Sequence, residues 1–380
     1  MSDPKTAVQA LTPDAIHAAY SLIQPYIHRT PLLTSQTLNT IASTPQLPES
    51  LLGTPFEGQT PATPTFRFFF KCENYQRIGA FKARGAFHAL LRLIAERGKE
   101  EVQRRGVITH SSGNHAQALA LAASTLSIPA HIVMPSISTP SKIAGTRSHG
   151  AQVVFSGSTS TEREAVVADI QAKTDAILIP PYDDFNIICG QGTTALELEA
   201  QYHDLVKEKP QLSVHGQGTG VLNAVITPVG GGGLNAGVAT FFSDKTATQV
   251  FGAEPSFEGA DDCRRGLQTG ERVGMVKTLT IADGLRTPVG VLNWEVISDR
   301  SKVAGVYAVS EEQIMAAMRL VLERMKVVVE PSAVVGLAVC LFNEEFRRRV
   351  AQEGGEQGWD VGVVFSGGNT TVEAIGKLFG

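Results

Sequence analysis

A chain of 380 residues is long enough for two packed lobes, and its 43% hydrophobic and 18% charged residues are ordinary for a soluble globular enzyme. Because the net charge is only −4, we expect neither nucleic acid nor an anionic membrane as a partner. No apolar run reaches membrane-spanning length, and residues 1–5 lack the pattern of a signal peptide. The four cysteines are far apart and form no CxxC pair, which indicates reduced thiols and predicts a cytoplasmic protein: Cys72, Cys189, Cys263 and Cys340.

The N-terminal region predicts one helix followed by a long irregular segment. Thr12 can cap a helix that has Pro13 at its first position, and helical spacing continues from Ala15 to Ile27. Residues 36–65 are rich in Thr, Pro and Ser and show no periodicity, so we expect a surface excursion there. Residues 207–222 predict a second surface loop.

From Phe66 onward, strand-like and helix-like segments alternate. The expected strands are Phe68–Cys72, Gly106–Thr109, His131–Met134, Gln152–Phe155, Ala176–Ile179, Val225–Val229, Gln249–Ala253 and Val361–Phe365. The expected helices include Ala116–Ser124, Thr161–Thr174, Thr193–His203 and Glu311–Lys326. This alternation predicts an α/β protein with mostly parallel sheets.

Four consecutive glycines, Gly230–Gly233, lie between a strand-like stretch and a helix-like stretch that begins at Leu234. Glycines at such a junction leave backbone N–H groups unobstructed, and the positive end of the following helix favours an anion, which is typical of a phosphate cradle. The run has neither the GxGxxG spacing of a dinucleotide fingerprint nor the GK[ST] ending of a P-loop. A tight turn or close strand–helix packing would produce the same run.

Three further segments carry candidate chemistry. Lys82 follows a glycine and an aromatic residue at an expected helix start, where it is either a solvated lysine or an amine that forms a Schiff base. Thr109–Gln117 reads Thr-His-Ser-Ser-Gly-Asn-His-Ala-Gln, a loop that can bind a carboxylate or simply cap a helix. Val364–Thr370 likewise ends a strand in small polar residues.

These segments gain meaning together, because all of them fall at expected carboxyl ends of strands, where ligands bind in open α/β sheets. A phosphate, an aldehyde partner for Lys82 and an amino-acid carboxylate together describe pyridoxal phosphate (PLP) with an amino-acid substrate.

From Arg29-Thr-Pro-Leu-Leu33 to the final helix, the chain resembles the serine racemase and serine/threonine dehydratase family of fold-type II PLP enzymes, which includes threo-3-hydroxyaspartate dehydratase-like members. The resemblance implies a tryptophan synthase β-like fold of two lobes, each with a mostly parallel open sheet flanked by helices. It implies a large PLP-binding domain (1–105 and 185–380), a small inserted α/β domain (106–184) that closes over substrate, and a homodimer. With so little chain after Ser366, we expect no C-terminal regulatory domain.

The family's motifs assign roles to individual residues. In G-[SA]-F-K-x-R-G-A the lysine forms the Schiff base, which falls on Lys82, with Phe81 against the ring. In S-[SA]-G-N-H the asparagine, here Asn114, bonds the ring oxygen, and the loop Ser111, Ser112, Gly113, Asn114 and His115 binds substrate. The glycines Gly230, Gly231, Gly232 and Gly233 and the Leu234 amide hold the phosphate, and Ser366 faces the pyridine nitrogen. Since a hydroxyl is a poor acid, an unprotonated ring is expected, which suits elimination or a brief carbanion better than transamination.

The residue type at position 112 helps to distinguish the activities found in this family. Racemase-like members carry a second serine here, proposed to protonate the carbanion on the face opposite Lys82, whereas dehydratases restricted to threonine usually have alanine. Two acid/base groups on opposite faces are what racemisation requires. The resemblance therefore favours a racemase/dehydratase acting on L-serine and related β-hydroxy amino acids. The alternatives are a threonine or threo-3-hydroxyaspartate ammonia-lyase without racemase activity, a β-replacement enzyme of the cysteine synthase type, and a catalytically idle amino-acid or PLP sensor.

Weaker carry-overs complete the site. Ala253–Cys263 resembles a racemase segment that binds Mg²⁺ or Ca²⁺, with Glu254, the Ala260 carbonyl and Asp262 as ligands. This chain has two extra residues there, so either the loop bulges or Glu258 takes a ligand place. Arg163 matches an arginine that can face the substrate's distal end, which would suit a β-carboxylate. Thr287 matches a serine that touches substrate, and Ala80 replaces the serine usual before Phe-Lys.

Overall fold

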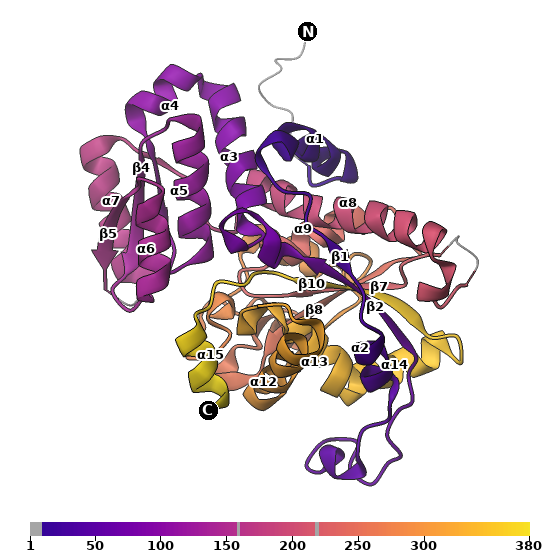
Figure 1. Cartoon of the computed structure of the whole chain (residues 1–380). Helices are drawn as coiled ribbons and strands as arrows, with labels where there is room; N and C mark the ends of the chain where they lie inside the picture. Colours follow the sequence, from indigo (N-terminus) through magenta and orange to yellow (C-terminus); the bar gives the residue numbers. More distant parts are fainter. Residues whose placement is uncertain (1–9, 158–159, 217–219) are drawn as a thin grey trace.

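Two sheets organise the computed structural model, which describes residues 10–157, 160–216 and 220–380 (Figure 1). In the order of their pairing, the larger sheet contains β1 (Leu32–Leu33), β2 (Phe66–Cys72), β10 (Trp359–Phe365), β7 (Ala224–Pro228), β8 (Gln249–Pro255) and β9 (Gly305–Val309). The smaller sheet contains β5 (Gln152–Ser156), β4 (Ala130–Pro135), β3 (Val107–His110) and β6 (Ile177–Leu178). All pairs are parallel except β1 with β2, which confirms the predicted class.

Helices cover both faces of the larger sheet, as parallel sheets require. One face packs against α1 (Pro13–Ile23), α8 (Phe185–Glu208), α9 (Gly233–Phe242), α10 (Asp262–Thr269) and α11 (Val291–Ile297). The other packs against α2 (Gln36–Ser43), α12 (Glu311–Leu320), α13 (Val335–Phe342), α14 (Glu344–Gly354) and α15 (Val372–Phe379). Core residues on β2 alternate accordingly, with Phe68 and Phe70 in one layer and Phe69 in the other.

The smaller sheet is also covered on both faces. On one side, Val107 and Ile132 pack against α3 (Lys82–Arg97), α4 (Lys99–Arg105) and α5 (Asn114–Leu126). On the other side, Ile108 and Val133 pack against α7 (Ser160–Thr174). The remaining helix, α6 (Pro140–Ser148), lies beside α5 and β5. The small sheet thus shares one apolar core with α3, the helix that begins at Lys82.

The irregular segments differ in part from expectation. Residues 36–65, predicted as a surface excursion, begin with α2, because Ser35 caps a helix whose Leu38 and Ala42 are buried in the core. In the second segment, α8 extends to Glu208, and the Ser213 hydroxyl and Val214 amide donate to buried Asp360. Residues 217–219 of that segment, and residues 1–5 on which the signal-peptide prediction rested, lie outside the described residues.

Two strands of the larger sheet were not predicted from the sequence, namely the short strand β1 and the edge strand β9. The Thr12 cap is confirmed, since its hydroxyl accepts the Ala15 amide, but α1 ends at Ile23. The four cysteines are buried and not paired in disulfides. Within the described ranges, no helix combines the length and hydropathy needed to cross a bilayer.

Candidate active site

One cavity of about 1140 Å³ lies where the carboxyl ends of β3, β4, β7 and β10 approach each other. It is lined by every residue predicted to act on cofactor or substrate: Phe81, Lys82, Ser111, Ser112, Gly113, Asn114, His115, Arg163, Gly230, Gly231, Gly232, Gly233, Leu234, Thr287 and Ser366. Residues more than 280 positions apart in the sequence therefore line the same cavity. The three predicted metal ligands do not line this cavity.

Lys82 begins α3 and points into the cavity. Its amine donates to the Pro181 carbonyl (2.7 Å) and lies 5.2 Å from the centre of the Phe81 ring. Burial lowers the pKa of Lys82 to about 8. The Phe81 amide donates to the Ser366 carbonyl (3.1 Å), so the lysine and the strand-end serine are joined through the backbone.

The two aspartates that follow Pro181 and Tyr182 accept hydrogen bonds from the starts of two helices. Asp183 accepts the amides of Val291 and Leu292 at the start of α11. Asp184 caps α8 by accepting the amides of Asn186 and Ile187. Two adjacent side chains thus hold the starts of two different helices beside the Lys82 amine.

The four glycines form the turn between β7 and α9, with Gly232 at φ +92°. A Cβ at Gly231 would lie 2.3 Å from Tyr182 Cγ, and one at Gly232 would lie 2.9 Å from Asn293 Cβ. Asn293 also donates to the Gly231 carbonyl (2.6 Å), which holds the turn in shape. The turn therefore needs glycine for space and conformation, and its amides lie at the positive end of α9.

The Ser/Asn loop joins β3 to α5. Ser112 is exposed toward the cavity, while His115 is buried, and burial lowers its pKa well below the usual value, so the ring is neutral. Asn114 donates from Nδ2 to Glu330 Oε1 (2.7 Å) and accepts from Asn369 Nδ2 at its Oδ1 (2.8 Å). These two contacts orient the Asn114 amide and leave its second N–H for a ligand.

The sequence analysis did not predict a charged group that also lines the cavity beside the Ser/Asn loop. Lys142 of α6 pairs with Asp283 and lies 4.0 Å from Glu330 Oε2. Burial raises the pKa of Glu330 to about 7, although Lys142 opposes the rise. Burial alone would lower the pKa of Lys142, but Asp283 and Glu330 raise it. A lone acid in the apolar run Val327–Val335 was a usable signal for Glu330, whereas Lys142 stands in an ordinary polar helix.

Arg163 and Thr287 also line the cavity. Arg163 is half-buried, and burial lowers the pKa of its guanidinium. Ala80 forms an isolated bridge with Gly367, so a methyl group stands where the family usually has a hydroxyl.

Glu254 and Asp262 form a separate buried acidic pair beside α10. Glu254 accepts the amides of Cys263 and Arg264, and Asp262 accepts the Val289 amide. Burial and the neighbouring carboxylate raise the pKa of Glu254 well above its usual value, and burial raises the pKa of Asp262 to about 6. In the segment with the two extra residues, Glu258 (φ +49°) is exposed, accepts the Leu279 amide and lines the cavity.

Comparisons with known proteins agree with this geometry. A family model described as pyridoxal-phosphate dependent enzyme matches residues 53–367. The chain is 38% identical over 366 residues to a serine racemase of Arabidopsis thaliana, which covers 96% of this chain and 95% of that protein. It is 35% identical over 362 residues to an L-threo-3-hydroxyaspartate ammonia-lyase of Saccharomyces cerevisiae, which covers 95% of this chain and 94% of that protein. Among solved structures, maize serine racemase matches with a TM-score of 0.79 at 34% identity, with 97% of each chain covered.

The two mostly parallel sheets, with a glycine turn and an amine at their carboxyl ends, define an α/β enzyme of fold type II. The chain belongs to the pyridoxal-phosphate dependent enzyme family. The predicted family, the fold class and PLP as the cofactor are confirmed.

Proposed function

We propose that this enzyme is a PLP-dependent serine racemase and dehydratase acting on L-serine and related β-hydroxy amino acids. Two outcomes are expected, namely the D-amino acid by racemisation and a keto acid plus ammonia by β-elimination. The observation that carries the proposal is the single cavity lined by the Lys82 amine, the Ser112 hydroxyl and the four-glycine turn. The names of the Arabidopsis, yeast and maize relatives support the same substrate class.

The residues around the cavity fit PLP. A Cβ at any of the four glycines would meet a neighbouring atom at 3.0 Å or less, so these positions require glycine, whose backbone N–H groups no side chain covers from a phosphate. Gly230–Gly233 and the Leu234 amide would hold the phosphate, Asn114 the ring oxygen, Ser366 the ring nitrogen, and Lys82 the aldehyde carbon, with Phe81 beside the ring. When bound, the cofactor supplies the electron sink for a carbanion at the substrate's α-carbon.

Lys82 is the proposed base, and Ser112 the proposed acid on the opposite face. With a pKa of about 8, more of the Lys82 amine is unprotonated at neutral pH than in an ordinary lysine. In racemisation, the α-proton moves to Lys82 Nζ, the Ser112 hydroxyl delivers its proton to the other face, and both groups regain their starting states by proton exchange with solvent. In elimination, Lys82 takes the α-proton and passes it to the β-hydroxyl, which leaves as water, and hydrolysis of the released aminoacrylate gives keto acid and ammonia. The loop Ser111–His115, at the start of α5, would bind the substrate carboxylate.

A second candidate function is a threo-3-hydroxyaspartate ammonia-lyase. Arg163 lines the cavity, where a guanidinium would pair with a β-carboxylate. The yeast relative is named for this activity. Thr287 is proposed to contact the same end of the substrate.

We also propose that Glu254, the Ala260 carbonyl and Asp262 bind Mg²⁺ or Ca²⁺. Burial raises the pKa of both carboxyls, and Asp262 raises that of Glu254 further, so the pair forms a donor set that a hard divalent cation satisfies. Within the described residues, no cluster of three or more His, Cys, Asp or Glu side chains is arranged for a metal, so the carbonyl is a necessary part of this proposal.

The lobe assignment also remains a proposal, with residues 106–184 as the small domain and 1–105 and 185–380 as the large one. Lys142 and Asp283 come from these two parts and pair across the cavity, which supports closure of the small lobe over substrate. A homodimer and a cytoplasmic location remain predictions.

The test is a product assay on PLP-loaded enzyme with L-serine, L-threonine and L-threo-3-hydroxyaspartate, with and without Mg²⁺. D-enantiomer and keto acid are measured in the same samples, beside Lys82→Ala and Ser112→Ala. We expect D-serine that disappears in Ser112→Ala while keto acid persists. Keto acid alone in the wild type would make the enzyme a dehydratase. No product, with a cofactor absorbance that still changes on adding L-serine, would favour a sensor. Full activity in Lys82→Ala would refute the whole proposal.

A further inference from the structure

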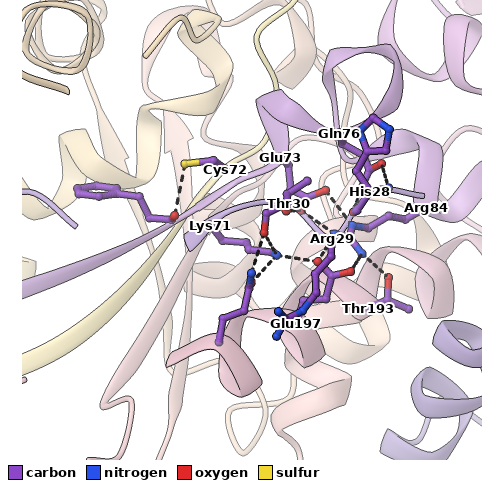
Figure 2. Close-up of polar contacts among 12 residues, drawn as sticks. His28, Arg29, Thr30, Lys71, Cys72, Glu73, Gln76, Arg84, Thr193 and Glu197 are labelled. Atoms are coloured by element: carbon purple, nitrogen blue, oxygen red, sulfur yellow. Dashed lines mark hydrogen bonds and ion pairs between the residues drawn. The ribbon is translucent and has the colours of Figure 1, made fainter. Parts of the chain in front are cut away.

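Near the start of α3, four buried charged side chains form a cluster of hydrogen bonds and ion pairs (Figure 2). Lys71, Glu73 and Arg84 have no exposed surface, and Glu197 is 1% exposed. The two cations and two anions come from the end of β2, the turn after it, the first turn of α3 and the middle of α8. None of them lines the cavity, and the proposed reaction uses none of them.

Arg84 is held by every hydrogen-bond donor that it has. Its Nε and Nη2 donate to the two oxygens of Glu73 (both 2.8 Å). Its Nη2 and Nη1 also donate to the two oxygens of Glu197 (2.8 and 3.1 Å), and Nη1 donates to the Thr193 hydroxyl (3.2 Å). A guanidinium with two bidentate carboxylates and one hydroxyl has a single allowed orientation.

Lys71 completes the cluster from the other side of Glu197. Its amine donates to Glu197 Oε2 (2.7 Å), to Gln201 Oε1 (2.7 Å) and to the Thr30 carbonyl (2.8 Å), so all three donors are used. The Thr30 hydroxyl in turn donates to Glu73 (2.6 Å). The network therefore ties the N-terminal segment, β2, α3 and α8 at one point.

Stability alone does not account for this cluster. Removing charges from water is costly, and well-packed apolar side chains of similar volume often stabilise a protein as much as a buried ion pair does. Unlike a cluster of apolar side chains, a cluster of buried ion pairs fixes the direction in which each of its side chains points.

The position of Arg84 in α3 shows which direction is fixed. Successive residues turn by about 100° around a helix, so Arg84, two positions after Lys82, points about 200° away from it. Lys82 faces the cavity and Arg84 faces the core between β2 and α8. Locking the guanidinium therefore locks the rotation of the helix start that carries the Lys82 amine.

The ion pair between Arg84 and Glu73 also joins the two ends of a strained turn. The segment from Glu73 to Arg84 contains Ile78 at φ +58°, a conformation that a β-branched residue rarely adopts. Asn369 donates to the Ile78 carbonyl (2.8 Å), and the Gly368 amide donates to the Gly79 carbonyl (2.9 Å). Strain of this kind persists only where the surroundings hold both ends of the segment.

We propose that Arg84, clamped between Glu73 and Glu197, is a positioning residue that sets where the Lys82 amine stands. The proposal rests on the proposed function, because it assigns Lys82 to cofactor and proton transfer. A displacement of about 1 Å of a reacting group can cost about 10²-fold in rate.

The main experiment compares Arg84→Lys with Arg347→Lys. Arg347 is a matched control, since it is equally buried and donates to the carbonyls of Ala42 and Thr44, but it lies against the opposite face of the larger sheet. For each variant, three properties are measured: the melting temperature, the pH midpoint of the bound cofactor's absorbance change, and kcat separately from KM. Hydrogen exchange is followed on the peptide covering residues 77–90.

We expect Arg84→Lys to shift the pH midpoint by at least half a unit and to lower kcat at least tenfold, with KM within threefold of the wild type. Exchange at residues 77–90 should increase. Arg347→Lys should lower the melting temperature comparably and leave the midpoint, kcat and exchange unchanged. If the two variants behave alike once matched for stability, Arg84 is structural only and the proposal is wrong.

Thr193→Val is a milder variant for the case in which Arg84→Lys does not fold. It removes one of the five hydrogen bonds with almost no change in volume, so we expect the same shifts at smaller size. A wild-type midpoint and wild-type kcat in this variant would count against the proposal. If the wild type itself formed no cofactor absorbance band that depends on Lys82, the proposed function would fail before this inference was tested.

Discussion

The Lys82 amine lies 2.7 Å from the carbonyl oxygen of Pro181. A carbonyl accepts a hydrogen bond from the amine in either protonation state, so the contact places Nζ without adding a charge beside it. Burial is then the factor that lowers the pKa of Lys82 to about 8.

The first prediction concerns this amine in the cofactor-free protein. Because only the unprotonated amine is nucleophilic, its acylation rate should rise with a midpoint near pH 8, instead of the ordinary 10.5. Peptide mass spectrometry after brief labelling at a series of pH values gives the midpoint. Lys173, whose side chain is 68% exposed, is the reference in the same digest. A Lys82 midpoint near 10.5 would show that burial does not act as described.

The second prediction concerns the glycine turn. Gly231→Ala would put a Cβ 2.3 Å from Tyr182 Cγ, so the ring or the turn must move, and affinity for PLP should fall at least tenfold. Titration of the cofactor-free protein with PLP, followed by absorbance, measures the affinity. Gly376→Ala in α15 has nothing within 4 Å of the added Cβ and should leave PLP binding unchanged. Its melting temperature should stay the same or rise, since alanine is favoured over glycine in a helix by about 1 kcal/mol. Equal affinity of Gly231→Ala and the wild type for PLP would contradict the proposal that the glycine turn binds the phosphate.

The third prediction is a pH dependence of stability that comes from Glu330. Its pKa is raised from 4.5 to about 7 in the folded protein, so its contribution is fully present below pH 4.5 and is lost as the pH rises through 7. Glu330→Gln should therefore become more stable relative to the wild type between pH 5 and 8, by up to about 3 kcal/mol. Urea unfolding at several pH values measures the difference. Glu356→Gln, at an exposed position, should follow the wild type throughout. A pH-independent difference for Glu330→Gln would refute the assignment.

The fourth prediction concerns the acidic pair beside α10. In the metal-free protein the raised pKa values of Glu254 and Asp262 mean that stability falls as the pH rises through about 6. Mg²⁺ or Ca²⁺ should reverse that loss, so the cation should raise the melting temperature by several degrees at pH 8 and much less at pH 5.5. Glu254→Gln should abolish the effect of the cation, whereas Glu258→Gln should retain it. Equal melting curves in EDTA and in Mg²⁺ or Ca²⁺ would remove the metal proposal.

Much of the candidate site was predictable because its residues stand at strand ends. A strand, a glycine run and a helix are local patterns, and parallel strands bring their carboxyl ends to one edge, which is why Lys82, Ser112 and Ser366 meet. Glu330 and Lys142 were not predictable in the same way, since their contact depends on how the two sheets face each other. Helix α2 was missed because its Thr, Asn and Ser residues hide the spacing of Leu38 and Ala42.

The sequence also left open how the chain absorbs its two extra residues after Glu254. Glu258 has a positive φ, and its exposed side chain accepts the Leu279 amide and lines the cavity, whereas Glu254 and Asp262 are buried. Neither residue type nor spacing specifies such a turn, because a non-glycine residue adopts it only when its surroundings enforce it.

The last strand of the larger sheet lies between β2 and β7, with Phe365 paired to Cys72. During synthesis on the ribosome, β2 and β7 are made before β10. Nearly 300 residues are added between the end of β2 and the start of β10. A nascent chain that already contains Lys82 and the four glycines still lacks β10, the strand that pairs with both β2 and β7. We therefore expect the newly made protein to acquire its cofactor only after translation is almost complete, and truncation before residue 359 to yield a chain that cannot retain it.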